Sequence, residues 1–151
     1  MNTLDIYNKI KKDIISYDIF LGVFSRDQLP STRLLRFPCT FIINTDKQTE
    51  PGEHWLAFYY DKNKNATFFD PCGLSPKVYG LEAYLKNTSS NWSFNSKRIQ
   101  SFFSVLCGEI CIFFLYFVSR NFSLNFILNL FSNNYEQNEK VILNFLNFNF
   151  I

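Results

Sequence analysis

The chain has 151 residues, of which 47% are hydrophobic and 19% aromatic, and its formal net charge is only +2. This length and composition predict one globular domain, residues 1–151, with a sizeable core, and they exclude a disordered or low-complexity protein. The small net charge gives little reason to expect an obligatory polyanion partner.

The cysteines and the apolar runs limit which metal sites and which cellular compartments the sequence allows. Four cysteines and a single histidine show no CxxC or other metal-binding spacing, so we expect free thiols, no metal site and no required cofactor. The N-terminal residues do not read as a secretory signal, and the uninterrupted apolar run Ile110–Val118 is far shorter than the roughly 20 residues of a membrane helix. We therefore expect neither secretion nor a membrane span, but a reducing compartment.

Taken in chain order, the first segments predict a helix and then two short apolar segments. Apolar residues recur at helical spacing over residues 3–16, with lysines on the other face. The run FLGVF at residues 20–24 is short and interrupted by Gly22. After a loop-like segment at residues 26–38, the run Cys39–Asn44 predicts a buried strand.

A hairpin is predicted next. A polar segment ends in a Pro51–Gly52 turn, and residues 54–60 are apolar and aromatic throughout, which is typical of a strand covered on both faces. Residues 61–65 form a polar loop, and residues 66–70 form the return strand, stopped by Pro71.

The second half of the chain predicts mainly helices. Its expected elements are a helix, a strand, an apolar helix and two terminal helices at residues 78–86, 92–99, 107–118, 124–131 and 136–148. The last helix carries Val141, Phe145 and Phe148 on one apolar stripe. This order predicts an α+β domain with a mostly antiparallel sheet packed on one buried helix.

Cys107 is the candidate nucleophile. The helix that it begins is apolar on all sides from Ile110 to Val118, so it belongs in the centre of the domain. A thiol at a helix N-terminus feels the helix dipole and the free N–H groups of the first turn, which favour the thiolate. His54 is the only imidazole that could serve as its base, and the alternative is an ordinary strand-end histidine.

Two further residues complete the candidate site. The hairpin loop is centred midway between His54 and Asp70, so pairing of its strands brings both to one end, where the carboxylate can orient the ring. The alternative for Asp70 is a turn residue before proline. Gln100, seven residues before Cys107, could donate to an oxyanion, and the alternative is an exposed loop glutamine. Trp55 is a lid over the histidine or a core residue.

The other three cysteines are expected to have structural rather than catalytic roles. Cys111 lies one turn after Cys107 inside the apolar run, so we expect a small core residue rather than a second nucleophile. Cys39 is expected to be core as well. Cys72 follows Pro71 close to the candidate site and is expected to be structural, with redox sensitivity as the alternative.

These residues also carry a resemblance. The strings GEHWLAFYY and FFDPCG, followed by Gln100 and LCGEIC, resemble the adenovirus-type (adenain-like) maturation proteases. The relatives of that family include the proteases of virophages and Maverick/Polinton elements and, more distantly, the SUMO-specific proteases. The similarity covers roughly residues 18–118, and its motifs are specific only in combination.

The resemblance implies a papain-like cysteine protease fold. By position, His54 would be the base and Asp70 the orienting carboxylate. Gln100 would be the oxyanion donor and Cys107 the nucleophile. It further implies a monomeric endopeptidase that cleaves viral capsid and core precursor proteins after glycine, in the virion or at the intracellular site of virus assembly.

The resemblance also bears on activation. It implies stimulation by DNA and by a viral peptide that forms a disulfide, but residues 86–100 contain no cysteine, so we expect no such covalent link. Lys97 and Arg98 could contact phosphates, and a solvated strand end is the alternative. Two other functions stay open: a protease of ubiquitin-like modifiers, and a non-catalytic binding domain.

Overall fold

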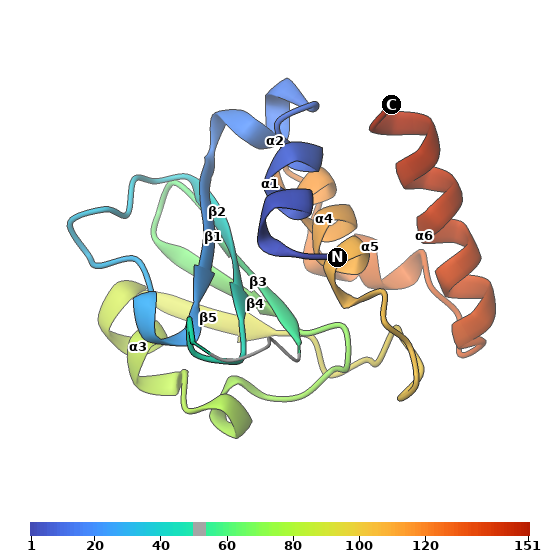
Figure 1. The fold of residues 1–151 in the computed structure, drawn as a ribbon. Helices are drawn as coiled ribbons and strands as arrows, with labels where there is room; N and C mark the ends of the chain where they lie inside the picture. The colour runs from blue at the N-terminus through green and yellow to red at the C-terminus, as the bar shows by residue number, and fades with distance from the viewer. Residues whose placement is uncertain (50–53) are drawn as a thin grey trace.

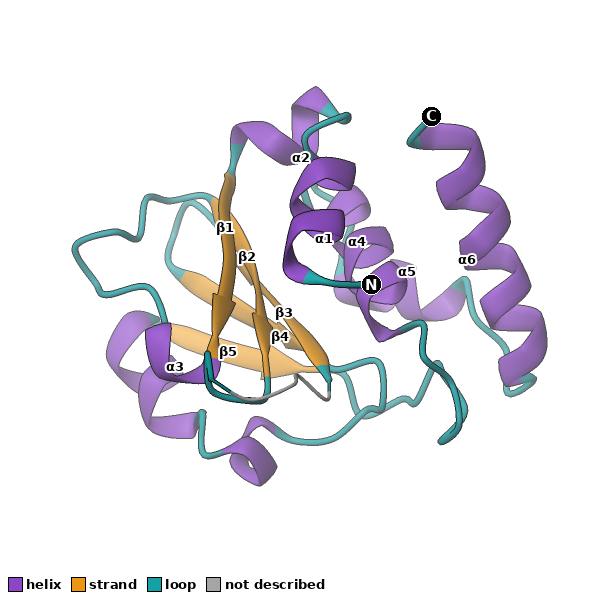
Figure 2. Ribbon diagram, viewed as in Figure 1, coloured by secondary structure: helices purple, strands orange, loops and turns teal. Residues whose placement is uncertain are grey.

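A computed structural model describes residues 1–49 and 54–151, and within them a five-stranded sheet is covered by helices on both faces (Figures 1 and 2). The strands are β1 (Phe20–Ser25), β2 (Cys39–Asn44), β3 (Trp55–Tyr60), β4 (Asn65–Phe69) and β5 (Asn91–Phe94). The α-helices are α1 (Thr3–Ile10), α2 (Ile14–Asp18), α3 (Glu82–Thr88), α4 (Cys107–Val118), α5 (Leu124–Asn129) and α6 (Tyr135–Asn149). The short 3-10 helices are η1 (Arg26–Gln28) and η2 (Pro76–Tyr79). The predicted Pro51–Gly52 turn lies outside the described residues.

The strands lie in sequence order across the sheet. The central pairs β2–β3 and β3–β4 are antiparallel, but the outer pairs β1–β2 and β4–β5 are parallel, so the sheet is mixed rather than mostly antiparallel. The reason is the length of the connections. A tight hairpin joins β3 to β4, whereas residues 26–38 and 70–90 are long enough to return the chain to the same end of the sheet before the next strand begins.

Helix α4 occupies the centre of one core, as its composition predicts. It contacts β3 and the helices α1, α2, α5 and α6, and its Phe114 ring stacks on Phe69 of β4 with centroids 4.3 Å apart. On the opposite face of the sheet, Phe41 and Phe58 pack beneath Tyr84 of α3. Among the described residues, no helix combines the length and hydropathy that crossing a bilayer requires.

Several element boundaries differ from the sequence-based prediction. The helix expected over residues 3–16 is two helices, because Asp13 caps a new one by accepting a hydrogen bond from the Ser16 N–H at 3.1 Å. The FLGVF run is a complete edge strand, in which Gly22 adopts a φ of 141° at an irregularity of the β1–β2 register. The strand expected over residues 92–99 ends at Phe94.

An ion pair ties the entrance of α2 to the end of α4. The Arg120 guanidinium donates to both carboxylate oxygens of Asp13, at 2.9 and 2.7 Å, and stacks on the Tyr116 ring at 3.5 Å. Burial alone would raise the pKa of Asp13, but hydrogen bonds from Arg120 and Ser16 outweigh it and lower the pKa. The charged carboxylate therefore stabilises the fold.

We predict that Asp13→Asn lowers the free energy of unfolding by about 2–3 kcal/mol at pH 7, because a charge-assisted pair is lost. The folded-state pKa of Asp13 lies below the ordinary value of 3.8, so the difference between variant and wild type should persist above that pH and shrink as pH falls through the folded pKa. Urea unfolding followed by circular dichroism at several pH values measures it. Asp18→Asn, at an exposed neighbouring position, is the matched control, and equal stability of the two variants would refute the role of the pair.

Candidate active site

Asp70 is a buried carboxylate that several hydrogen bonds hold in place. It follows β4 directly, is 0% exposed, and accepts four hydrogen bonds. Its donors are the His54 ring (2.7 Å), the Tyr79 hydroxyl (2.7 Å) and the backbone N–H groups of Cys72 (2.8 Å) and Leu74 (3.1 Å). A buried carboxylate with this many donors is held in one position.

The turn after β4 creates two of those donors. Pro71 stops the strand and the chain folds back, so that the N–H groups of Cys72 and Leu74 face the carboxylate. Asn95, after β5, fixes the backbone of Asp70 from the other side: its Oδ1 accepts from the Asp70 N–H at 2.8 Å, and its Nδ2 donates to the Asp70 carbonyl at 2.6 Å.

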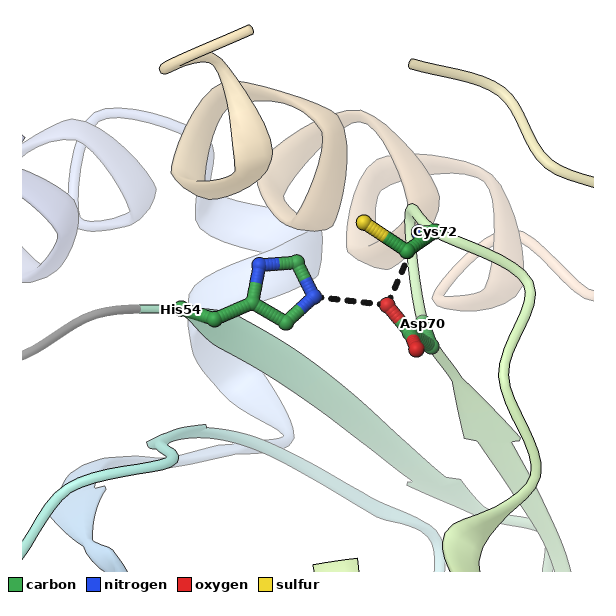
Figure 3. Close-up of side chains that lie close together, drawn as sticks. All are labelled: His54, Asp70 and Cys72. Carbon is green, nitrogen blue, oxygen red and sulfur yellow. Dashed lines mark hydrogen bonds and ion pairs between the residues drawn. The ribbon is translucent and has the colours of Figure 1, made fainter. Parts of the chain in front are cut away.

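His54 precedes β3, and Figure 3 shows its Nε2 directed at Asp70 and its second ring nitrogen, Nδ1, on the side away from that carboxylate. The hairpin register therefore places both side chains at one end of the sheet, as predicted. Burial alone would lower the pKa of His54, but hydrogen bonds to Asp70, Cys107 and Cys72 outweigh it and raise the pKa to about 11. The ring therefore keeps its proton at neutral pH.

Cys107 is the first residue of α4 and is 7% exposed. Its thiol is one of the groups that raise the pKa of the His54 ring. The residue before it, Leu106, provides no side-chain cap, so the first-turn N–H groups remain directed at this end of the helix. The positive end of the helix dipole and the protonated ring thus both act on the sulfur.

Gln100 lies beside this pair and is 3% exposed, so it is not the exposed loop residue of the alternative interpretation. Its Nε2 donates to Cys72 Sγ at 3.4 Å, and its Oε1 has no hydrogen-bond partner within the described part of the chain. A hydrogen bond from α6 holds the preceding backbone, because Asn138 Nδ2 donates to the Ile99 carbonyl at 3.1 Å.

Sequence reasoning missed two contributors, Tyr79 and Asn95, and it placed Cys72 close to the site but expected a structural role. One ring nitrogen of His54, one carboxylate oxygen of Asp70 and Cys72 Sγ all lie within 4.8 Å of one another, a group that could hold a metal ion (Figure 3). The position of Cys72, two residues after the acid, was the available signal. No comparable signal marked Tyr79 or Asn95, which lie 9 and 25 residues after Asp70.

The remaining candidates have packing contacts. Trp55 is 9% exposed within the α4 core and donates from Nε1 to the Met1 carbonyl at 3.2 Å. Cys111 is fully buried, and this burial raises its pKa. Lys97 Nζ donates to two backbone carbonyls, at 3.1 and 2.6 Å, and Arg98 lies 3.3 Å over the Phe102 ring. Cys39 is also buried, and burial raises its pKa to about 12.

Comparison of the sequence with known proteins agrees with the motif resemblance. A family model described as adenovirus endoprotease matches residues 20–143, which extends beyond the motifs into α6. The protease of Human adenovirus A serotype 12 is 29% identical over 122 residues. The matched region is 71% of this chain and 59% of that protease, so the chain spans less than two thirds of the relative's length.

Comparison with solved structures supports the fold. A protease of ASFV superimposes with a TM-score of 0.52 at 20% identity, covering 82% of this chain and 59% of that one. The central domain of an uncharacterized Legionella pneumophila protein gives a TM-score of 0.55 at 12% identity, covering 97% of both chains. At these identities the likeness concerns the fold alone, and the expected α+β, papain-like fold of the adenain type is confirmed.

We predict that the pKa of the single imidazole lies far above its ordinary value of 6.5 and toward about 11. Asp70→Asn and Cys107→Ala should each lower that midpoint, because each removes a hydrogen bond that stabilises the charged ring. The stability contributed by this ring is complete below pH 6.5 and is lost as pH rises toward 11. With one histidine in the chain, NMR of its ring protons reports the value directly, and a wild-type midpoint near 6.5 would refute the arrangement.

Gly73 closes the turn that holds Asp70, and we predict that Gly73→Ala destabilises the site. Gly73 has a φ of 72°, and an added Cβ would lie 2.8 Å from the Arg98 nitrogen. Gly80→Ala is the matched control, because its φ is 69° but the nearest atom is 3.7 Å away. Thermal unfolding should show Gly73→Ala to be less stable than Gly80→Ala by about 1–3 kcal/mol, and equal losses would mean that the turn has room for a side chain.

Proposed function

The chain belongs to the adenovirus endoprotease family, and on this premise we propose that it is a cysteine endopeptidase with Cys107 as nucleophile and His54 as its acid–base partner. The observation that carries the proposal is the His54 ring, which lies 2.7 Å from the buried Asp70 carboxylate and whose pKa is raised by both Asp70 and the Cys107 thiol. Nucleophile, base and orienting group are thereby connected in series.

The raised pKa of His54 favours a thiolate–imidazolium pair as the resting state. The ring takes the proton of Cys107, and the first turn of α4 and the charged ring together stabilise the thiolate. Asp70 holds Nε2 and so sets the orientation in which Nδ1 is free to serve the sulfur. The thiolate then attacks the scissile carbonyl carbon and forms a C–S bond, while the carbonyl oxygen becomes an oxyanion.

The oxyanion would be stabilised at the N-terminus of α4. The backbone N–H of Cys107 and the Gln100 side-chain amide are the proposed donors, and one such donor is worth about 10²–10³ in turnover. The burial of Gln100 and the hydrogen bond between Asn138 and the Ile99 carbonyl support this role, because they hold the amide next to the cluster.

His54 would next protonate the leaving amine. The Cys107 hydrogen bond helps to raise the pKa of the ring, so converting the thiolate into a thioester removes that contribution and makes the imidazolium a stronger acid when the C–N bond breaks. The ring, now neutral, then takes a proton from water, whose oxygen attacks the thioester and releases the second product. The thiolate–imidazolium pair is thereby restored.

The substrates that we propose are viral capsid and core precursor proteins cleaved after glycine, in the virion or at the site of assembly. The similarity to an adenovirus protease supports this choice. Stimulation by DNA or by a viral peptide belongs to the same proposal, without a disulfide link, since residues 86–100 contain no cysteine. Lys97 and Arg98 are engaged by backbone carbonyls and the Phe102 ring, so they give this stimulation no support.

We predict that Cys107→Ala reduces cleavage of a Gly-Gly-X capsid peptide by at least about 10³-fold, because the covalent step is lost. Cys111→Ala is the matched control: its sulfur lies one turn deeper in the same helix and is fully buried, so this variant should cleave the peptide at a rate close to that of wild type. Activity retained by Cys107→Ala would exclude it as nucleophile.

A second assay arm separates the substrate classes. The same preparations are given ubiquitin-like fusion proteins alongside the capsid peptide, each with and without DNA. Preferential cleavage of the fusions would replace the maturation role by that of a protease of ubiquitin-like modifiers. Cleavage of neither substrate, with or without DNA, would favour a non-catalytic binding domain.

A further inference from the structure

Cys72 has no role in the proposed reaction, yet its thiol lies within the catalytic cluster. Its sulfur is within 4.8 Å of a ring nitrogen of His54 and an oxygen of Asp70, and it accepts from Gln100 Nε2 at 3.4 Å. The Cys72 and Cys107 thiols both help to raise the pKa of the His54 ring. Two thiols and a carboxylate therefore act on one imidazole.

This set of donors suits a particular kind of ion. Thiolate and imidazole ligands select zinc among the divalent cations that are common in cells, and zinc accepts them in a tetrahedron with bonds of about 2.0–2.3 Å. The His54 nitrogen, the Asp70 oxygen and Cys72 Sγ already lie within 4.8 Å of one another, and Cys107, the first residue of α4, would complete the tetrahedron by moving its side chain toward them. Oxygen-seeking ions such as magnesium and calcium gain little from two sulfurs.

The carboxylate is better suited to an outer role. Asp70 already accepts hydrogen bonds from Tyr79 and two backbone N–H groups in addition to His54, so moving it would break several bonds at once. A histidine that binds a metal through one ring nitrogen commonly donates a hydrogen bond from its other ring N–H to such a carboxylate. If Asp70 keeps Nε2, then Nδ1 and the two sulfurs are left for the ion.

We propose that Zn²⁺ binds to His54, Cys72 and Cys107 and reversibly blocks the proposed protease. Binding would release the Cys72 thiol proton and the Nδ1 proton of His54 to solvent, form bonds from zinc to Nδ1, to the Cys72 sulfur and to the Cys107 thiolate, and leave the fourth position to water. The nucleophile and its base would both be occupied, so no attack on a peptide could occur until a chelator or a competing thiol removed the ion.

The sequence shows no zinc-binding motif, because the three proposed ligands come from separate elements. His54 precedes β3, Cys72 lies in the turn after β4, and Cys107 begins α4. The site is therefore an assembled cluster rather than a motif. It differs from a structural zinc site, since two of its ligands are the proposed catalytic groups and Asp70 is already satisfied by its own hydrogen bonds.

Zinc affinity tests the binding step without any reference to catalysis. Competition of the full chain with a chromophoric chelator should show one equivalent bound, with the affinity reduced by more than about 100-fold in Cys72→Ala and in Cys107→Ala, because loss of an outer-shell partner alone costs 10–100-fold. Cys72→Ser provides a second variant of nearly unchanged volume. Cys39→Ala, buried in the other core, is the control and should bind as wild type does.

Two readouts decide the outcome. Cobalt substituted for zinc should give a thiolate-to-metal charge-transfer band, and this band should weaken in Cys72→Ala. If both Cys72 variants bind the metal as tightly as wild type does, the proposal is overturned. The inhibitory part rests on the proposed function. Zinc should stop peptide cleavage by wild type, and a chelator should restore it. For each Cys72 variant, the zinc concentration that halves its own uninhibited rate should be more than about 100-fold higher than for wild type. A zinc-binding chain that cleaves no peptide would instead refute the protease.

Discussion

The buried carboxylate of Asp70 is the constraint on which the rest of the site depends. A charge with no access to solvent is tolerated only when its oxygens are fully hydrogen-bonded. The turn after β4 supplies two backbone donors, η2 supplies Tyr79 and the start of β3 supplies His54. Satisfying this one group therefore fixes the ring opposite the N-terminus of α4, and the remaining chemistry follows from that position.

Those parts of the fold that depend on neighbouring residues could be predicted from the sequence. The hairpin was visible because apolar runs flank a polar loop, and its midpoint alone placed His54 and Asp70 at one end. The buried position of α4 followed from a composition with no polar face. A solitary histidine also left little choice of base.

Features that depend on contacts between distant segments could not be predicted. The parallel edges of the sheet follow from where long connections return, which no local pattern records. In α6, Phe145 of the predicted stripe packs against the core, but Phe148 is 81% exposed, and the adjacent stripe supplies the buried residues Ile142 and Leu146. Periodicity identifies a helix, but neighbouring helices decide which of two apolar stripes faces inward.

Asn138 links the C-terminal helix α6 to the segment that carries Gln100. Its amide reaches from α6 to the carbonyl of Ile99, and Lys97 is anchored nearby on the carbonyls of Leu128 and Phe131. Partial unfolding that detaches the last two helices would therefore release the segment around Gln100 in the same event. We therefore expect the segment around Gln100 to open together with the C-terminal helices, so that its amide-exchange protection is limited by the opening of α6.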